Sequence, residues 1–174
     1  MTLDETGPVP DFKLENVAVG PDPFSLSALP DDVEFAVLFF QRDHYCTNCR
    51  QQVRTLADRI DAFHDRNAEV VSIVPEPAER VAEWQDRYDL PYPLLADPDA
   101  TAGEAYDQPV RFGVLGRFSD FLGRMPEVVI VDRRGAASRI AYVHQGSSTF
   151  DRPDVDEILS ELDALTAERD GADG

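Results

Sequence analysis

The stretch Val37–Arg54, VLFFQRDHYCTNCRQQVR, constrains the fold more than any other part of the sequence. It contains both cysteines of the chain, Cys46 and Cys49, spaced as Cys-x-x-Cys. The apolar run Phe35–Phe40 before them predicts a buried strand. After the pair, apolar residues recur at spacings of three and four, which predicts a helix; they are Cys49, Val53, Leu56, Ile60 and Phe63. The two sulfurs are therefore expected where a strand ends and a helix begins.

This position has consequences for the chemistry of the thiols. The first turn of a helix offers unpaired N–H groups and the positive end of the helix dipole, and both stabilise a thiolate. Because the thiolate is the reactive form, a lowered pKa is expected here. Residues three apart on a helix lie roughly 5–6 Å apart at Cβ, and a loosened first turn brings them to the approach of about 3.5–4.5 Å that a disulfide needs. Cys46 and Cys49 are thus predicted to exchange between dithiol and disulfide.

Two other interpretations of the pair are a reduced structural pair and half of a zinc site. Zinc would require two further ligands from carboxylates or from the three histidines, and the sequence has no second cysteine pair; the histidines are His44, His64 and His144. Redox chemistry is the preferred interpretation. Neither a metal nor a bound cofactor is predicted.

The charge of the chain limits its partners. The sequence has 34 acidic and 16 basic residues, a net charge of −18, and Lys13 is its only lysine. Such a field repels nucleic acid and anionic membranes, so neither is expected as a partner. The composition resembles that of proteins from extreme halophiles, whose acidic surfaces stay hydrated in concentrated salt where charge repulsion is screened.

Length and segment composition predict one cytoplasmic domain. A chain of 174 residues is large enough for one core, so residues 1–174 are expected to form a single domain. The start MTLDETGPVPDF lacks the basic and apolar regions of a signal peptide, and no apolar run is long enough to span a membrane. In a reducing cytosol a Cys-x-x-Cys pair is more often catalytic or metal-binding than a static crosslink.

The remaining pattern predicts an α/β fold with a central mixed β-sheet flanked by helices on both faces. Short strands are expected at Phe12–Val17 and after Pro91, and residues 169–174 are expected to fray. The stretch Pro109–Arg124 is expected to be a loop or hairpin. The strong strands are predicted at Val33–Gln41, Ala68–Val74, Glu127–Val131 and Arg139–His144. Helices are predicted from the cysteine pair to about Arg66, and at Glu76–Tyr88, Ala100–Tyr106 and Pro153–Glu168.

Four segments follow one another in order along nearly the whole chain: Pro8–Leu14, Phe39–Cys49, Tyr88–Asp99 with Tyr106, and Pro126–Gly135. Together they resemble the alkyl hydroperoxide reductase/thiol-specific antioxidant (AhpC/TSA, peroxiredoxin) branch of the thioredoxin-fold redoxins. The resemblance implies a thioredoxin fold with a peroxiredoxin-like N-terminal extension. It also implies an antioxidant oxidoreductase that reduces peroxides.

The resemblance assigns the two sulfurs in two ways. On the peroxiredoxin pattern, Cys49 takes the place of the peroxidatic cysteine, Cys46 stands where the family has threonine, and Arg42 stands where it has proline. Cys46 would then resolve the sulfenic acid by closing a disulfide. On a thioredoxin-like pattern, Cys46 is the exposed nucleophile and Cys49 its partner one turn into the helix. Both assignments remain open at this point.

Three residues before the expected strand at Glu127 are candidates for the site. Met125-Pro126 resembles the cis-proline that packs beside the cysteines of thioredoxin-like proteins, where the Met125 backbone would pair with a substrate chain; a trans proline that starts a strand is the alternative. The arginine that faces the thiolate in peroxiredoxins has Pro126 in its place here. Arg124, two residues earlier, is therefore a candidate for that role.

Three residues around the pair are candidates for supporting roles. Arg50 would lower the pKa of Cys49 if it folds back; an exposed arginine is the alternative. His44 would shuttle a proton or support the thiolate as imidazolium, or else face solvent. Tyr45 resembles the aromatic residue that covers the thioredoxin pair.

Together these features predict a thiol-dependent enzyme that reduces peroxides through Cys46 and Cys49. The first alternative is a thioredoxin-like protein thiol–disulfide oxidoreductase. The alternative from another class is a non-enzymatic redox-sensing or metal-binding module. The expected partners are a peroxide or disulfide substrate and an external thiol reductant of the thioredoxin type, and the expected assembly is a monomer or homodimer.

Overall fold

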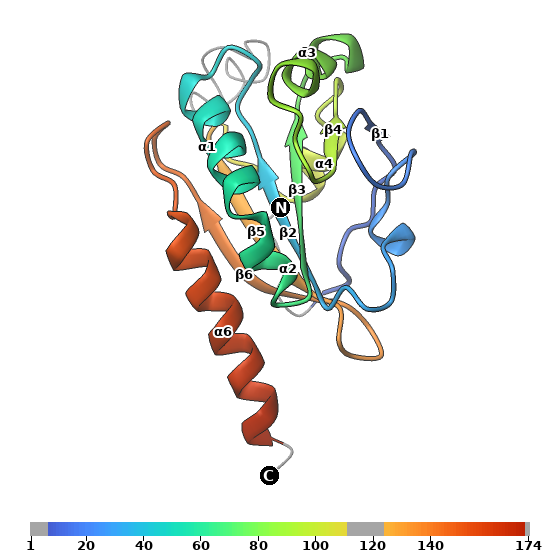
Figure 1. Cartoon of the computed structure of the whole chain (residues 1–174), viewed down its shortest axis with the longest axis vertical. Helices are drawn as coiled ribbons and strands as arrows, with labels where there is room; N and C mark the ends of the chain where they lie inside the picture. The colour runs from blue at the N-terminus through green and yellow to red at the C-terminus, as the bar shows by residue number, and fades with distance from the viewer. Residues whose placement is uncertain (1–6, 111–123, 173–174) are drawn as a thin grey trace.

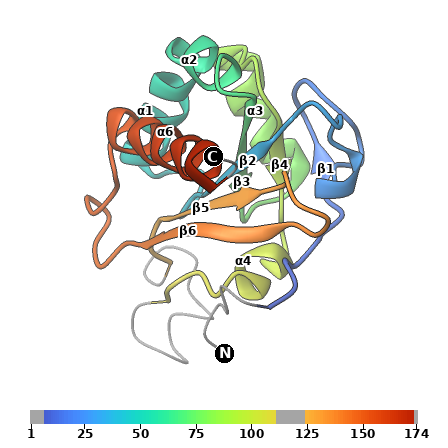
Figure 2. The same ribbon diagram turned by 90° about the horizontal axis from the view of Figure 1, so that it is seen from below.

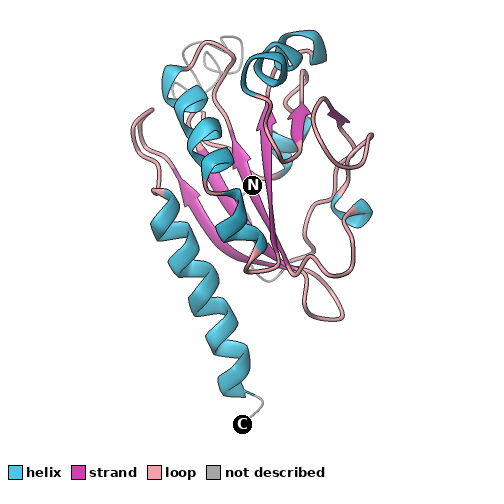
Figure 3. Ribbon diagram, viewed as in Figure 1, coloured by secondary structure: helices cyan, strands magenta, loops and turns pink. Residues whose placement is uncertain are grey.

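A mixed six-stranded sheet forms the centre of the computed structural model, which describes residues 7–110 and 124–172. Its strands are β1 (Glu15–Asn16), β2 (Phe35–Phe40), β3 (Ala68–Val74), β4 (Leu94–Ala96), β5 (Glu127–Asp132) and β6 (Arg139–Gln145). The helices are the 3₁₀ turn η1 (Leu26–Ala28) and α1 (Thr47–Asp58), α2 (Ile60–His64), α3 (Ala78–Tyr88), α4 (Thr101–Ala105) and α6 (Val155–Ala172). The predicted α/β class and mixed sheet are confirmed (Figures 1 and 3).

The strand order places β2 inside the sheet. The order is β1-β4-β3-β2-β5-β6, with β2, β3 and β4 mutually parallel and β5 and β6 antiparallel to their neighbours. All six residues of β2 are buried, because their side chains point alternately into the two cores on the faces of the sheet. Along its edges, β2 pairs with β3 on one side, where Leu38 faces Val71, and with β5 on the other, where it faces Val129. The cysteine pair therefore follows the end of a strand that is fixed on both edges.

Helices cover both faces of the sheet, as expected. One core lies between the sheet and α1, α2, α3 and α6, and the other lies beneath α4 and the N-terminal segment that carries Phe12 and Phe24 (Figure 2). Ion pairs join α6 to the α1–α2 region, from Asp156 to Arg59 at 2.8 Å and from Asp163 to Arg66 at 2.7 Å. The site at the start of α1 thus rests on a packed layer.

Several predicted boundaries need correction. The helix after the cysteines breaks at Arg59, whose N–H is shared between the carbonyls of Thr55 and Leu56, so that α2 continues it in a separate turn. The predicted strand Phe12–Val17 shortens to β1, with an isolated bridge between Leu14 and Phe24. Helix α6 continues to Ala172, so the fraying predicted from residue 169 is wrong for 169–172. Most of the predicted loop or hairpin Pro109–Arg124 lies outside the described residues.

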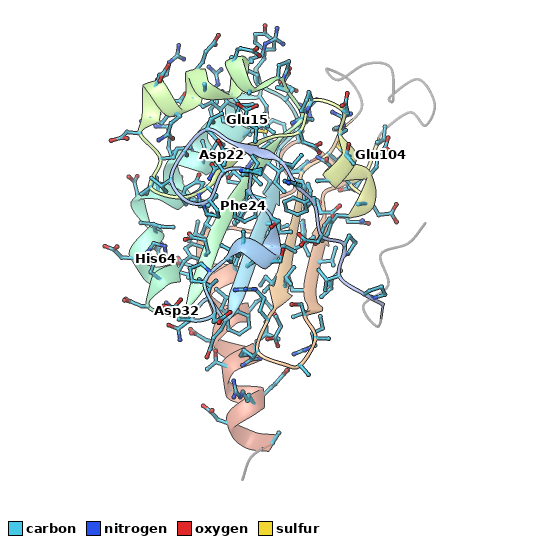
Figure 4. The ribbon with its side chains drawn as sticks, turned by 90° about the vertical axis from the view of Figure 1, so that its right-hand side faces the viewer. Glu15, Asp22, Phe24, Asp32, His64 and Glu104 are labelled. Carbon is cyan, nitrogen blue, oxygen red and sulfur yellow. The ribbon has the colours of Figure 1, made fainter. Side chains whose placement is uncertain are left out.

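The described surface is rich in exposed carboxylates. Figure 4 labels four exposed acidic residues, Glu15, Asp22, Asp32 and Glu104, from separate parts of the chain. At a net charge of −18, folding brings the acidic side chains closer together, so they repel one another. Salt screens this repulsion, because the screening length falls from about 10 Å at 0.1 M to about 3 Å at 1 M. No described helix is both long and apolar enough to cross a membrane.

Salt is expected to stabilise the fold. Raising KCl from about 0.1 M to about 2 M should raise the midpoint of thermal unfolding by roughly 5 °C or more, because screening removes self-repulsion of the compact state. Circular dichroism melts at several salt concentrations measure this. A midpoint that stays constant or falls with KCl would contradict the salt-adapted interpretation of the composition.

Candidate active site

The first cysteine caps the helix that carries the second. Cys46 is the N-cap of α1, and its sulfur accepts a hydrogen bond from the Cys49 N–H at 3.2 Å. At most helix starts a serine, threonine, aspartate or asparagine oxygen accepts this bond. Cys49 lies one turn into the helix, on the buried stripe with Val53 and Leu56. The structure thus brings the two predicted cysteines together as free thiols at the strand–helix junction. Cys46 is 7% exposed and Cys49 is 0% exposed.

An arginine from the C-terminal part of the chain contacts both sulfurs. Nη2 of Arg152 donates to the Cys49 sulfur at 3.0 Å and lies 3.5 Å from the Cys46 sulfur. Arg152 belongs to the connection between β6 and α6. No sequence pattern predicted this residue: it is 103 positions from Cys49 and belongs to no motif or periodic pattern.

Two glutamines hold the guanidinium in place. Nη1 of Arg152 donates to Gln52 Oε1 at 2.9 Å and to Gln41 Oε1 at 3.3 Å, and Nε donates to the Thr149 carbonyl at 3.1 Å. Gln41 follows β2 directly and is fully buried, while Gln52 lies on α1. The planar fork of arginine fits this set of acceptors in a fixed orientation. The cation is thereby directed at the sulfurs by a residue that follows β2 and by a residue of α1, the helix that carries Cys49.

The two thiols ionise differently. The pKa of Cys46 falls to about 6, chiefly because the Cys49 thiol donates a hydrogen bond to it; the Cys49 N–H and the Arg152 charge add to this, while burial and Asp43 oppose it. Burial raises the pKa of Cys49, and its bond to Cys46 raises it further. The pair therefore carries one thiolate near neutral pH, on Cys46, the more exposed sulfur.

Alkylation should report this ionisation. The rate at which iodoacetamide labels reduced Cys46 is expected to rise with pH, with a midpoint at about pH 6, and to fall about tenfold for each pH unit below that midpoint, because only the thiolate reacts. Mass spectrometry of the labelled peptides measures the rate for each cysteine. A midpoint near the ordinary value of about 8.5 would contradict the lowered pKa.

Arg42 supports Cys49 through its backbone. Its N–H lies 3.5 Å from the Cys49 sulfur, and its Nε donates to the Arg124 carbonyl at 2.8 Å. A proline, which the peroxiredoxin pattern has at this position, lacks the N–H that makes the first contact. The departure at Arg42 therefore adds a donor to the site.

The structure decides between the alternatives for the segment before β5. The peptide bond between Met125 and Pro126 is trans. The Met125 N–H donates to the Pro109 carbonyl at 2.9 Å and its carbonyl accepts from Gln108 Nε2 at 3.1 Å, so this backbone is engaged within the chain rather than open for a substrate. The Arg124 side chain lines a cavity beside α4, where its charge acts on Asp97. The arginine that reaches the sulfurs is Arg152.

The three candidates around the pair lie away from the sulfurs or act only through their backbone. The His44 ring stacks on Trp84 at 5.9 Å, and its Nε2 lies 3.2 Å from Glu83, so it faces α3 rather than the thiols or open solvent. Tyr45 is 61% exposed and packs edge-on against His44. The Arg50 N–H makes an ordinary first-turn bond to the Cys46 carbonyl at 3.1 Å. The nearby charges that act on the Cys46 pKa come from Arg152 and Asp43.

Two further observations describe the surroundings of the pair. Within residues 7–110 and 124–172, no group of three or more histidine, cysteine or acidic side chains is placed to hold a metal ion. A cavity of about 270 Å³ lies beside the site between α1 and α6. Arg152, which contacts both sulfurs, and Gln52 line this cavity, whereas neither cysteine does.

This sheet, with a Cys-x-x-Cys pair at the junction of β2 and α1 and an N-terminal segment over the second face, defines a protein of the thioredoxin fold. The chain belongs to the AhpC/TSA family, which it matches over residues 6–139. The expected family and fold are confirmed.

Relatives and solved structures agree with this assignment. Over 80 residues, 44% of this chain, it is 30% identical to MT2597 of Mycobacterium tuberculosis, whose name places it with the peroxiredoxins. Over 74 residues it is 23% identical to the peroxiredoxin Bcp of Bacillus subtilis. The chain spans about half the length of these curated relatives.

Among solved structures, AhpC of Enterococcus faecalis superposes with a TM-score of 0.80 at 17% identity, covering 100% of this chain and 98% of that one. The peroxidoxin BcpB of Mycobacterium tuberculosis gives a TM-score of 0.72 at 22% identity, covering 91% of this chain and 96% of that one. At these identities the similarity establishes the fold.

Proposed function

We propose that the chain is a thiol peroxidase in which Cys46 attacks and Cys49 resolves. The Cys46 thiolate displaces an alcohol or water from the O–O bond of a hydroperoxide and becomes a sulfenic acid; the leaving oxygen takes up a proton. The Cys49 thiol then condenses with the sulfenic acid, which closes the Cys46–Cys49 disulfide and releases water. Two equivalents of an external thiol restore the dithiol by exchange.

The observation that carries this proposal is the contact of Arg152 with both sulfurs at the start of α1. Cleavage of the O–O bond places negative charge on the leaving oxygen, which would form next to the attacked sulfur. A fixed guanidinium and the N–H groups of a helix start stabilise such charge without reorganising. The lowered pKa of Cys46 supplies the thiolate near neutral pH.

Assigning the attack to Cys46 departs from the family pattern, in which Cys49 stands at the peroxidatic position. Two properties support the assignment. Cys46 is the more exposed sulfur, and burial raises the pKa of Cys49. A substrate from solvent meets Cys46 first, while Cys49 lies where it can close the ring after the first oxidation.

Protein disulfide exchange is the second candidate function. A thiolate at the start of a helix, followed by a buried cysteine one turn later, is also the arrangement that catalyses disulfide exchange. Against it, the Met125 backbone, which would pair with a substrate chain, is bonded to Pro109 and Gln108. Small disulfides remain accessible substrates under this candidate.

Competition between the two substrates tests the proposal. Reduced protein in high salt is mixed with equal amounts of hydrogen peroxide and a protein disulfide, and the loss of each is followed. The proposal predicts faster loss of peroxide, with the intramolecular disulfide as product. Preferential loss of the protein disulfide would make exchange the function, and loss of neither would contradict both.

The reductant is an external thiol of the thioredoxin type, the location is cytoplasmic, and the assembly is a monomer or homodimer. The acidic composition supports activity of the protein at high salt concentration. The alternative of a metal-binding module is tested by metal analysis of the purified protein and by its stability to chelation.

A further inference from the structure

The turn that carries Arg152 is closed by the preceding residue. Asp151 Oδ2 accepts hydrogen bonds from the Ser147 N–H at 2.8 Å and from its hydroxyl at 2.9 Å. Asp151 Oδ1 lies 3.0 Å from Nε2 of His144 on β6. One carboxylate therefore ties the end of the turn both to its beginning and to the adjacent strand.

The same turn is packed against the start of β5. The Gly146 N–H donates to the Pro126 carbonyl at 2.8 Å. A Cβ at Gly146 would lie 2.7 Å from the Asp151 carbonyl oxygen and 2.8 Å from Pro126 Cγ, both closer than real Cβ contacts. The absence of a side chain at Gly146 thus allows Asp151 to close over it, and the turn is fixed to the sheet.

The direction of the Arg152 side chain depends on this closure. Arg152 directly follows Asp151, and its N–H donates to the Phe150 carbonyl at 3.0 Å within the same turn. The guanidinium then reaches Gln52 and the Cys49 sulfur at 2.9 and 3.0 Å. An unclosed turn would have to lose conformational entropy each time the guanidinium docked, which weakens the contact.

We propose that Asp151 is a positioning residue, which holds the Arg152 guanidinium on the two sulfurs by closing the 146–152 turn and pairing with His144. Its consequence for turnover rests on the proposed peroxidase function. Its effect on thiol ionisation does not, because Arg152 acts on the sulfurs whatever oxidant they meet. Asp151 touches neither sulfur through any described contact and acts through Arg152.

The test is a double-mutant cycle read by the pH profile of Cys46 alkylation. Arg152→Gln is expected to raise the midpoint by about one pH unit, which lowers the rate at pH 5 about tenfold. Asp151→Ala is expected to raise it by at least half as much. The double variant is expected to match Arg152→Gln alone, because Asp151 has no route to the sulfurs once the cation is gone.

A matched control removes another carboxylate of the same connection. Asp154 caps α6 by accepting from the Glu157 N–H at 3.0 Å, so Asp154→Ala removes one negative charge without opening the turn. Its midpoint should equal that of the wild type. If circular dichroism shows that Asp151→Ala does not fold, Asp151→Asn replaces it, because asparagine keeps the shape of the side chain. The alkylation midpoint of Asp151→Asn is expected to lie between those of the wild type and Arg152→Gln.

Two results would overturn the positioning role. One is a wild-type midpoint in the Asp151 variants while Arg152→Gln is shifted. The other is a shift that adds in full to that of Arg152→Gln in the double variant, which would show an effect independent of the cation. A chain that ignores peroxide yet gives the predicted cycle would refute the proposed function and leave the positioning role intact.

Discussion

Cys46→Ser is expected to abolish peroxide consumption, by roughly a thousandfold or more, because it removes the nucleophile. Cys49→Ser is expected to react once and stop, since Cys46 still attacks but has no partner to close the disulfide. The oxidised Cys49→Ser protein should carry a sulfenic acid on Cys46, which a sulfenic-specific reagent traps for mass spectrometry. Stopped-flow peroxide consumption by the reduced proteins provides the rates.

The two serine variants serve as controls for each other, since each removes one sulfur from the same buried pair. The opposite result, in which Cys46→Ser keeps its first turnover and collects sulfenic acid on Cys49, would mean that the family pattern holds and that Cys46 resolves. Loss of the first turnover in Cys49→Ser would mean that the bond from Cys49 to Cys46 is needed for attack itself.

Arg152→Gln is expected to slow the first oxidation by about 10- to 100-fold. A hydrogen bond to a charged group contributes about 1.5–3 kcal/mol, and about 1.4 kcal/mol corresponds to a factor of ten in rate. Arg152→Lys should fall between wild type and Arg152→Gln, because an ammonium restores the charge but cannot make the forked contacts with Gln41 and Gln52. Single-turnover peroxide reduction measures this step.

Arg50→Gln is the matched control for this prediction. Arg50 is adjacent to Cys49 in sequence, but its contact with the site is the bond from its backbone to the Cys46 carbonyl. The substitution keeps that N–H and removes an equal charge, so the rate should change less than about twofold. Equal losses in the Arg50 and Arg152 variants would attribute the effect to net charge instead of to the contact with the sulfurs.

The part of the site that could be predicted from the sequence is the part built from local patterns. The apolar run of β2 and the three–four spacing after Cys49 are properties of neighbouring residues, so they placed the pair at the strand–helix junction. The buried stripe of α1 and α2 followed the predicted positions. Within this stretch, the break between α1 and α2 at Arg59 was not predicted.

The cation at the site could not be predicted in this way. Arg152 reaches the sulfurs from a connection whose direction is set by the closure of Asp151 on Ser147 and the packing of Gly146 on Pro126. The first contact lies within this connection and the second joins it to the residue before β5, and neither leaves a period in the sequence. Proximity in the chain favoured Arg50 and Arg124 instead, and neither side chain lies on the sulfurs.

Of the two interpretations of Met125 and Pro126, the structure has the trans proline, and the sequence could not decide between them for a related reason. The cis-proline interpretation was drawn from a dipeptide ahead of a strand, whereas the Met125 backbone is bonded to Gln108 and Pro109, which lie elsewhere in the chain. The position of the His44 ring is likewise set by its stacking on the Trp84 ring of α3. In each case a partner distant in sequence decided the local outcome.

The most direct test of the account is the intact mass of the reduced wild-type protein after one equivalent of hydrogen peroxide in high salt. Loss of about 2 Da, the two hydrogens released when Cys46 and Cys49 join, together with complete consumption of the peroxide, is the predicted result. A gain of about 16 Da that persists would mean that oxidation stops at the sulfenic acid and that the pair does not resolve. An unchanged mass with the peroxide still present would contradict the peroxidase function itself.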